Sequence, residues 1–160
     1  MNLHLIVADG AAVCGVAFGL YTLLAQRRAS RRHIRVTLRQ GVVPAGGDAR
    51  CVFLLRVVNA GSRTVTLTSP EIALPGGKRM AMLRPVSTVG VPCTLTESQD
   101  CTVIVDIEEV AHTFAQLGLH GKVKLSGQFT DSLGIVHRSG RMKVSADGVC
   151  QLAQEARLRV

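Results

Sequence analysis

The side chains best suited to chemistry lie in one short segment, where Glu108 and Glu109 precede His112. On a helix, Glu108 and His112 would share a face because they are four residues apart. A carboxylate beside an imidazole can exchange a proton or help to hold a metal ion. The same spacing is also that of a solvated helix surface, which is the interpretation we favour. We therefore expect no catalytic or metal-binding role for this segment.

Other signatures of catalysis and cofactor binding are missing from the sequence. There is no G-x-S-x-G motif, and neither Gly46-Gly47 nor Gly76-Gly77 has the Lys-Ser/Thr that completes a phosphate-binding loop. His120, His137 and Asp131 have no mutual spacing that indicates a site, and Asp131 is expected to form a turn. The sequence thus predicts no enzyme, no cofactor and no metal site.

The five cysteines do not form a metal-binding pattern, since no pair has C-x-x-C spacing and none lies in a local Cys/His cluster. Cys93 and Cys101 flank an expected turn over residues 96–100 and could face each other across a hairpin. In a reducing cytoplasm both would stay thiols. If the domain is exported, this pair is the first disulfide we expect.

The N-terminal segment, residues 1–26, is predicted to be a transmembrane anchor. Leu3 to Ala25 is almost wholly apolar or small, and about 20 such residues cross a hydrocarbon layer of about 30 Å. Asp9 would lie roughly one helical turn inside the hydrocarbon layer, where placing a carboxylate costs less free energy than at the centre of the bilayer. Two alternatives stay open, a buried helix of a soluble domain and a cleaved signal peptide. The second is disfavoured because no Lys or Arg precedes the apolar run.

A cationic linker, residues 27–32, follows the anchor directly. Because Lys and Arg accumulate on the cytoplasmic side of a span, this linker predicts a single-pass protein of the inner or plasma membrane with a cytoplasmic C-terminal domain. Its arginines are also expected to contact anionic headgroups of the lipid bilayer. They are Arg27, Arg28, Arg31 and Arg32.

Small residues recur every four positions along the predicted anchor, at Ala11, Gly15 and Gly19. This spacing lets two membrane helices approach closely. It predicts a helix–helix contact, and through it a homodimer.

The charge of the remaining chain gives no support for nucleic acid as a partner. The net charge is +8, but the basic residues after the linker are scattered among ten acidic ones from residue 40 onward. The chain has no Trp, and its one Tyr, Tyr21, is in the anchor. Nucleic-acid binding needs a concentrated basic surface, usually with aromatic side chains for stacking.

Residues 33–144 are predicted to form one antiparallel β-sandwich. From His33 the hydrophobicity alternates in short runs separated by Gly, Pro, Asn and Asp, without βαβ alternation. The strongest run, Arg50 to Asn59, is apolar on both faces and so belongs in the middle of a sheet or near an interface. Residues 107–117 have helical spacing and predict one short helix crossing between sheets. The tail, residues 145–160, has helical character but few apolar anchors.

Residues 55–67 have an apolar strand, an Asn-x-Gly turn and a second strand rich in Thr and Val, and residues 131–134 are expected to form a turn between two strands. The first stretch resembles the central strand pair of bacterial immunoglobulin-like domains, and the second is similar to the turn of their final hairpin. The overall plan resembles small membrane-anchored bacterial proteins with one such domain. The resemblance implies an immunoglobulin-like fold and no activity. The Cys–Trp–Cys core of antibody domains is missing.

These observations favour a membrane-anchored, non-catalytic interaction or scaffold module with an unknown protein partner. The hairpin over residues 71–83, flanked by Pro70 and Pro85, is the candidate docking site. The alternative is an exported, disulfide-containing domain that binds a ligand on the outer face of the membrane.

Overall fold

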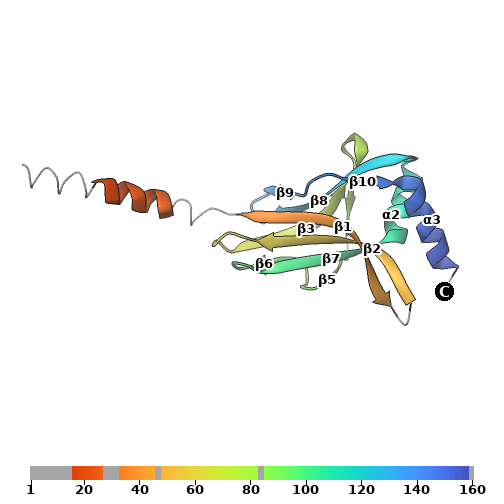
Figure 1. Ribbon diagram of the computed structural model, residues 1–160, viewed down its shortest axis with the longest axis horizontal. Helices are drawn as coiled ribbons and strands as arrows, with labels where there is room; N and C mark the ends of the chain where they lie inside the picture. The colour runs from red at the N-terminus through yellow and green to blue at the C-terminus, as the bar shows by residue number, and fades with distance from the viewer. Residues whose placement is uncertain (1–15, 27–32, 46–47, 83–84, 159–160) are drawn as a thin grey trace, which may run out of the picture.

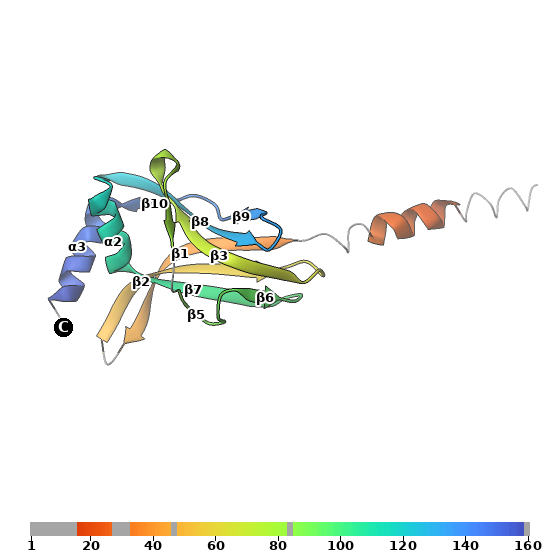
Figure 2. The ribbon, with the colours of Figure 1, turned by 180° about the vertical axis from the view of Figure 1, so that it is seen from behind.

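The computed structural model describes residues 16–26, 33–45, 48–82 and 85–158. Two antiparallel sheets pack face to face (Figures 1 and 2). The first has the order β1-β2-β7-β5, and the second has the order β10-β8-β3-β4, with β6 beside β3 and β9 beside β8. The prediction of a mainly β fold built from antiparallel sheets is confirmed.

The strands of the first sheet are β1 (Ile34–Ala45), β2 (Asp48–Asn59), β5 (Val86–Ser87) and β7 (Asp100–Asp106). Those of the second are β3 (Val65–Ala73), β4 (Arg79–Ala81), β6 (Cys93–Leu95), β8 (Lys122–Asp131), β9 (Val136–Arg138) and β10 (Met142–Ser145). A short 3-10 turn, η1 (Pro75–Gly77), joins β3 to β4.

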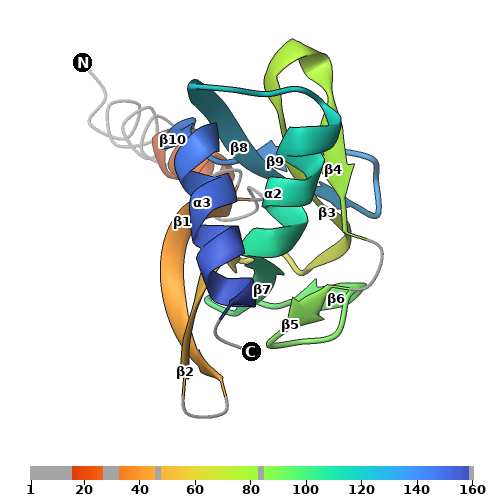
Figure 3. The same ribbon diagram turned by 90° about the vertical axis from the view of Figure 1, so that its right-hand side faces the viewer.

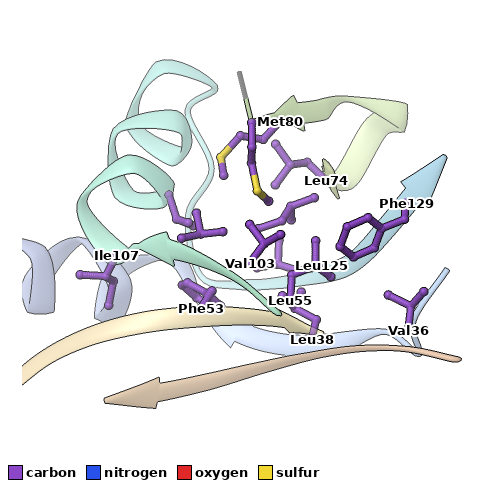
Figure 4. Packing of buried hydrophobic residues seen from close by; sticks show 14 of the residues in the cluster. Val36, Leu38, Phe53, Leu55, Leu74, Met80, Val103, Ile107, Leu125 and Phe129 are labelled. Carbon is purple, nitrogen blue, oxygen red and sulfur yellow. The ribbon is translucent and has the colours of Figure 1, made fainter. Parts of the chain in front are cut away.

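The core lies between the sheets, because alternate residues of each strand point inward. Phe53 and Leu55 of β2 meet Leu125 and Phe129 of β8 there (Figure 4), and all four are fully buried. β2 is the central strand expected from its apolar faces, since Leu55 is opposite Leu38 of β1 on one side and Val103 of β7 on the other.

Two helices, α2 (Ile107–Gln116) and α3 (Ala146–Arg157), lie side by side across one end of the sandwich (Figure 3). α2 is the helix predicted over residues 107–117 and ends before Gly118, whose φ is +61°. The C-terminal segment is an ordered helix on the domain and not only a tail. Its buried apolar residues are Ala146, Val149 and Ala153. Two of them are alanines, which give only a weak apolar pattern in the sequence.

Residues 16–26 are helical, and their large apolar side chains are exposed by 56–70%. Within the described residues, no helix combines the length and the hydropathy needed to cross a bilayer. Much of the predicted anchor lies outside the described residues, as do Ala11, Gly15, Arg27, Arg28, Arg31 and Arg32. Gly19 is described, and a Cβ at that position would meet nothing within 4 Å.

Candidate anion-binding cleft

A cleft of about 670 Å³ opens on the outer face of the second sheet. Its floor is the first half of β8. One wall is the turn between β3 and β4, which contains η1, and the other is the connection from β9 to β10, residues 139–141. The end view in Figure 3 shows β10 on one side of β8 and the β3–β4 hairpin on the other.

Six cationic side chains line this cleft, and no acidic residue is among the described lining residues. All six are exposed. Two come from the floor, two from the β3–β4 turn and two from the β9–β10 connection. They are Lys122, Lys124, Lys78, Arg79, Arg138 and Arg141.

Strand register explains how residues so far apart in sequence meet. Lys122 and Lys124 alternate with buried Val123 and Leu125, so both point to the outer face of β8. Arg138 of β9 is opposite Gln128, two residues beyond Ser126 on that same face. Arg79 of β4 is paired with Ala73 of β3, and Ala73 is paired with Ser126 of β8. Arg79 therefore lies on the same outer face as Ser126. The face is therefore cationic on both sides of β8.

The β9–β10 wall is fixed to the floor by Ser139. Its hydroxyl accepts a hydrogen bond from the Gly127 amide (2.9 Å) and donates one to the Gly140 carbonyl (2.8 Å). Its own carbonyl accepts from the Ser126 hydroxyl (3.1 Å), and its amide donates to the Gly127 carbonyl (2.8 Å). The edge strand is interrupted here between β9 and β10, as at a β-bulge, which redirects neighbouring side chains. Arg138 and Arg141 flank this rigid point.

The floor also contains one buried polar side chain, Gln128, which is 1% exposed. Its amide Nε2 donates to Oε2 of Glu71 on β3, and Nη1 of Arg79 lies 3.8 Å from the same oxygen. Glu71 thus offsets part of the charge of Arg79. None of the other five cations is ion-paired with a described acidic residue, so their charge is available to a ligand.

Sequence reasoning missed this site because the six cations are spread over residues 78–141. One local signal was present: the alternation of Lys122 and Lys124 with apolar residues predicts a cationic strip on one strand. The contributions of the β3–β4 turn and the β9–β10 connection depend on long-range strand pairing. The hairpin named as a docking site is confirmed as a hairpin, and it forms one wall of the cleft.

The acid–base candidates on α2 are engaged elsewhere. Glu108 Oε2 lies 3.2 Å from Arg157 Nε, and His112 Nε2 lies 2.9 Å from Gln116 Nε2. Across the described part of the chain, no three His, Cys, Asp or Glu side chains are grouped so that they could hold a metal ion.

The structure does bring Asp131 and His137 together, which their sequence spacing did not indicate. Asp131 Oδ2 lies 3.2 Å from His137 Nε2, while Oδ1 accepts from the amides of Leu133 and Ile135, both at 2.9 Å. Asp131 is therefore the turn former that the sequence predicts. Burial alone would raise the pKa of Asp131, but the hydrogen bonds from Ile135, His137 and Leu133 outweigh it and hold that pKa below its usual value.

We expect Asp131→Asn to lower the free energy of unfolding by about 2 kcal/mol near pH 7, because hydrogen bonds to a buried carboxylate exceed those to a neutral amide. The lowered pKa means that the folded state favours the ionised form. This contribution is complete above the usual carboxyl pKa of about 4 and is lost as pH falls through the lower folded value. Urea titrations should show the gap between wild type and variant closing below about pH 4. A gap that does not change with pH would contradict this account.

Cys93 and Cys101 are adjacent, but not as opposite residues of one hairpin ladder. Cys93 lies in β6, which pairs with β3, and Cys101 lies in β7, which pairs with β2 and β5. The prediction of a simple hairpin is wrong, because the short connection carries the chain from one sheet to the other. Both side chains are buried. Burial and the neighbouring Cys101 thiol raise the pKa of Cys93 to about 12, so the Cys93 thiol stays protonated at neutral pH.

Comparisons with known proteins add little to this picture. No model of a known protein family matches the chain, and no curated protein matches it. Among solved structures, it is similar to one described as "X-ray structure of Northeast Structural Genomics Consortium target SoR45". The identity is 14% and the TM-score 0.34, over 70% of this chain and 86% of that one. Likeness at this level carries no argument about fold or function.

Proposed function

We propose that this protein is a non-catalytic interaction module that binds an anionic partner in the cleft on its second sheet. The observation that carries the proposal is the gathering of six cations around one concave floor, with no acidic side chain among the lining residues that the structure describes. Like charges repel, so such a surface is costly in isolation and is relieved when an anion binds.

The affinity of such a site depends more on the number of ion pairs formed than on any single ion pair. An exposed ion pair contributes only about 0.5 kcal/mol, because water and salt screen it. Several cations acting on one polyanion add up, and Ser139 holds part of the site in place before the ligand arrives. Preorganisation reduces the entropy lost on binding. We therefore expect binding that depends strongly on salt and on the charge of the ligand.

The test uses the full chain in zwitterionic micelles, with fluorescently labelled heparin as a generic polyanion. We expect the double variant Lys122→Glu/Lys124→Glu to raise the Kd at least about tenfold, since it replaces two attractions by two repulsions. Raising the salt concentration from about 50 to about 200 mM should also raise the Kd of the wild-type protein.

The matched control is Arg50→Glu/Arg63→Glu, which makes the same change in net charge at two exposed residues outside the cleft lining. This control should leave the Kd close to that of wild type. Equal losses in both double variants would show that net charge and not the cleft attracts the polyanion. Absence of binding by wild type would refute the proposal.

We also propose that residues 1–26 tether the module to a membrane, with the domain in the cytoplasm. The exposed apolar side chains of the helix over residues 16–26 support this, because such a surface requires cover in water. The arginines of residues 27–32 support the orientation. A fluorescent reporter that matures only in the cytoplasm, fused after Val160, should be bright. An export-dependent phosphatase at the same position should be inactive.

The exported alternative keeps one specific observation in its favour. A bond between the adjacent, buried Cys93 and Cys101 would join the two sheets of the domain. Active phosphatase with a dark fluorescent reporter would select this alternative and make the disulfide the next measurement.

We further infer that the sandwich is of the immunoglobulin-like kind. The inference rests on the resemblance of residues 55–67 and 131–134, whose Asn59 and Asp131 both organise turns between strands. An experimentally determined structure with strand connections of another kind would overturn it.

A further inference from the structure

We propose that the anionic partner is an extended, acidic segment of a protein, with Asp or Glu at every second position, lying along β8. This inference rests on the proposed function and adds the class of ligand to it. Three properties of the cleft carry the argument: the length of its charged floor, its width, and the spacing of its lysines.

The first property is length, since the cations follow the strand and do not converge on a point. From Lys122 to Gln128, which is opposite Arg138, the floor contains seven residues of β8 and therefore six residue-to-residue steps. At about 3.3 Å per residue this is about 20 Å. A single phosphate or carboxylate could reach only part of such a row. The ligand that uses the whole row is a linear polyanion about seven residues long.

The second property is width, because β10 flanks β8 on one side at residues 122–125 and β3 flanks it on the other side at residues 126–131. Neighbouring strands are about 4.8 Å apart, so strands on the two sides of β8 are separated by about 10 Å, which is room for one extended chain. A nucleic-acid duplex is too wide for this space. A single strand of nucleic acid would find no aromatic side chain among the described lining residues on which to stack its bases.

The third property is the spacing of the floor cations. Lys122 and Lys124 point to the same side two residues apart, at about 6.6 Å. Side chains on one face of an extended peptide repeat at the same interval. Acidic side chains at alternate positions would therefore all face the floor, and the intervening side chains would point to solvent. A peptide with its acidic residues in one block would present only half of them to the lysines.

The cations of the two walls would also contact an extended acidic peptide. Lys78 and Arg79 on one side, and Arg138 and Arg141 on the other, flank the path of such a peptide. Arginine can hold a carboxylate through two parallel hydrogen bonds. The acidic segment would thus be contacted from its floor side by lysines and from its edges mainly by arginines.

The experiment measures fluorescence anisotropy of two labelled, capped peptides of about eight residues on the full chain in zwitterionic micelles. Both contain equal numbers of Glu and Thr, one alternating and one with the glutamates in a single block. We expect the alternating peptide to bind about fivefold more tightly, since two more of its carboxylates face the floor. Lys122→Glu/Lys124→Glu should abolish this preference, and Arg50→Glu/Arg63→Glu should retain it.

Other outcomes separate this inference from the proposed function. Equal binding of the two peptides would overturn the alternating register while leaving an anion-binding cleft. Binding of a tripolyphosphate, a single-stranded oligonucleotide or vesicles of phosphatidylglycerol, with no binding of either peptide, would overturn the acidic segment in favour of that ligand. If heparin and both peptides fail to bind, the cleft does not bind polyanions and both proposals fall.

Discussion

Replacing Asn59 by alanine should lower the free energy of unfolding by about 3–4 kcal/mol, because one buried amide satisfies three backbone groups. Asn59 is fully buried. Its Nδ2 donates to the carbonyls of Arg63 (2.8 Å) and Leu95 (3.0 Å), and its Oδ1 accepts from the Gly61 amide (3.1 Å). Alanine would leave these groups without their partner, and water cannot easily replace it in a closed turn.

The effect should be large because the Asn59 side chain also joins two distant turns, through its hydrogen bond to the Leu95 carbonyl at the end of β6. The backbone of Asn59 contacts the same turn, since its amide donates to the Gln99 carbonyl (2.9 Å) and its carbonyl accepts from the Ser98 amide (2.8 Å), and alanine would have to keep these two bonds without the support of the side chain. The turn after β2 is therefore connected to the turn between β6 and β7. Loss of the side chain loosens the end of the sandwich at which the two sheets exchange strands. A fall of about 3 kcal/mol is a large fraction of the 5–15 kcal/mol that stabilises a typical domain.

The measurement is urea unfolding followed by circular dichroism, with Gln99→Ala as the control. Gln99 lies in the neighbouring turn, is exposed, and its side chain accepts one hydrogen bond, from the Thr96 amide. Its replacement should cost no more than about 1 kcal/mol. If Asn59→Ala costs as little as Gln99→Ala, the buried amide is not the anchor of this turn cluster.

These turns were readable in the sequence because their chemistry is local. An Asn-x-Gly segment and the Asp131 turn specify backbone conformations within a few residues. The alternation of apolar residues specifies which face of each strand is buried, as for Leu55 and Phe129, both of which are fully buried. Helix α2 was readable for the same reason, since Val110 and Phe114 repeat on one face.

The cleft was not readable because it depends on register between segments far apart in the chain. No local rule predicts that β9 and β10 both pair with β8 and leave Ser139 at their junction. Nor does one predict that the β3–β4 turn lies beside that junction. In the sequence the basic residues are scattered, which argued against a concentrated cationic surface. The pairing of β8 with β3, β9 and β10 brings six of these residues together. The hairpin prediction for Cys93 and Cys101 was wrong for the same reason, because β6 and β7 pair with strands far away in the sequence.

Replacing Gly127 by valine should destabilise the protein by about 3 kcal/mol, because core side chains of the first sheet occupy the place of its missing side chain. A Cβ at Gly127 would lie 2.1 Å from Leu55 Cδ1 and 3.3 Å from Leu38 Cβ. Leu55 is fully buried, with Leu38 of β1 and Val103 of β7 as its register partners, so a turn of its side chain would bring it against other core residues. Valine adds further methyl groups to this contact, so β8 must move outward or the core must repack.

A double-mutant cycle tests this origin. Leu55→Ala alone should cost about 2–5 kcal/mol because it leaves a cavity. Combined with Gly127→Ala, the new methyl group enters that cavity, so the double variant should be more stable than the sum of the two single changes predicts. Gly140→Ala is the matched control, since a Cβ there would meet nothing within 4 Å. If the two free-energy changes are strictly additive, the missing side chain at Gly127 is not what makes room for Leu55. The predicted coupling would connect the core with the cleft, because the Gly127 amide also donates a hydrogen bond to Ser139 in the wall of the cleft.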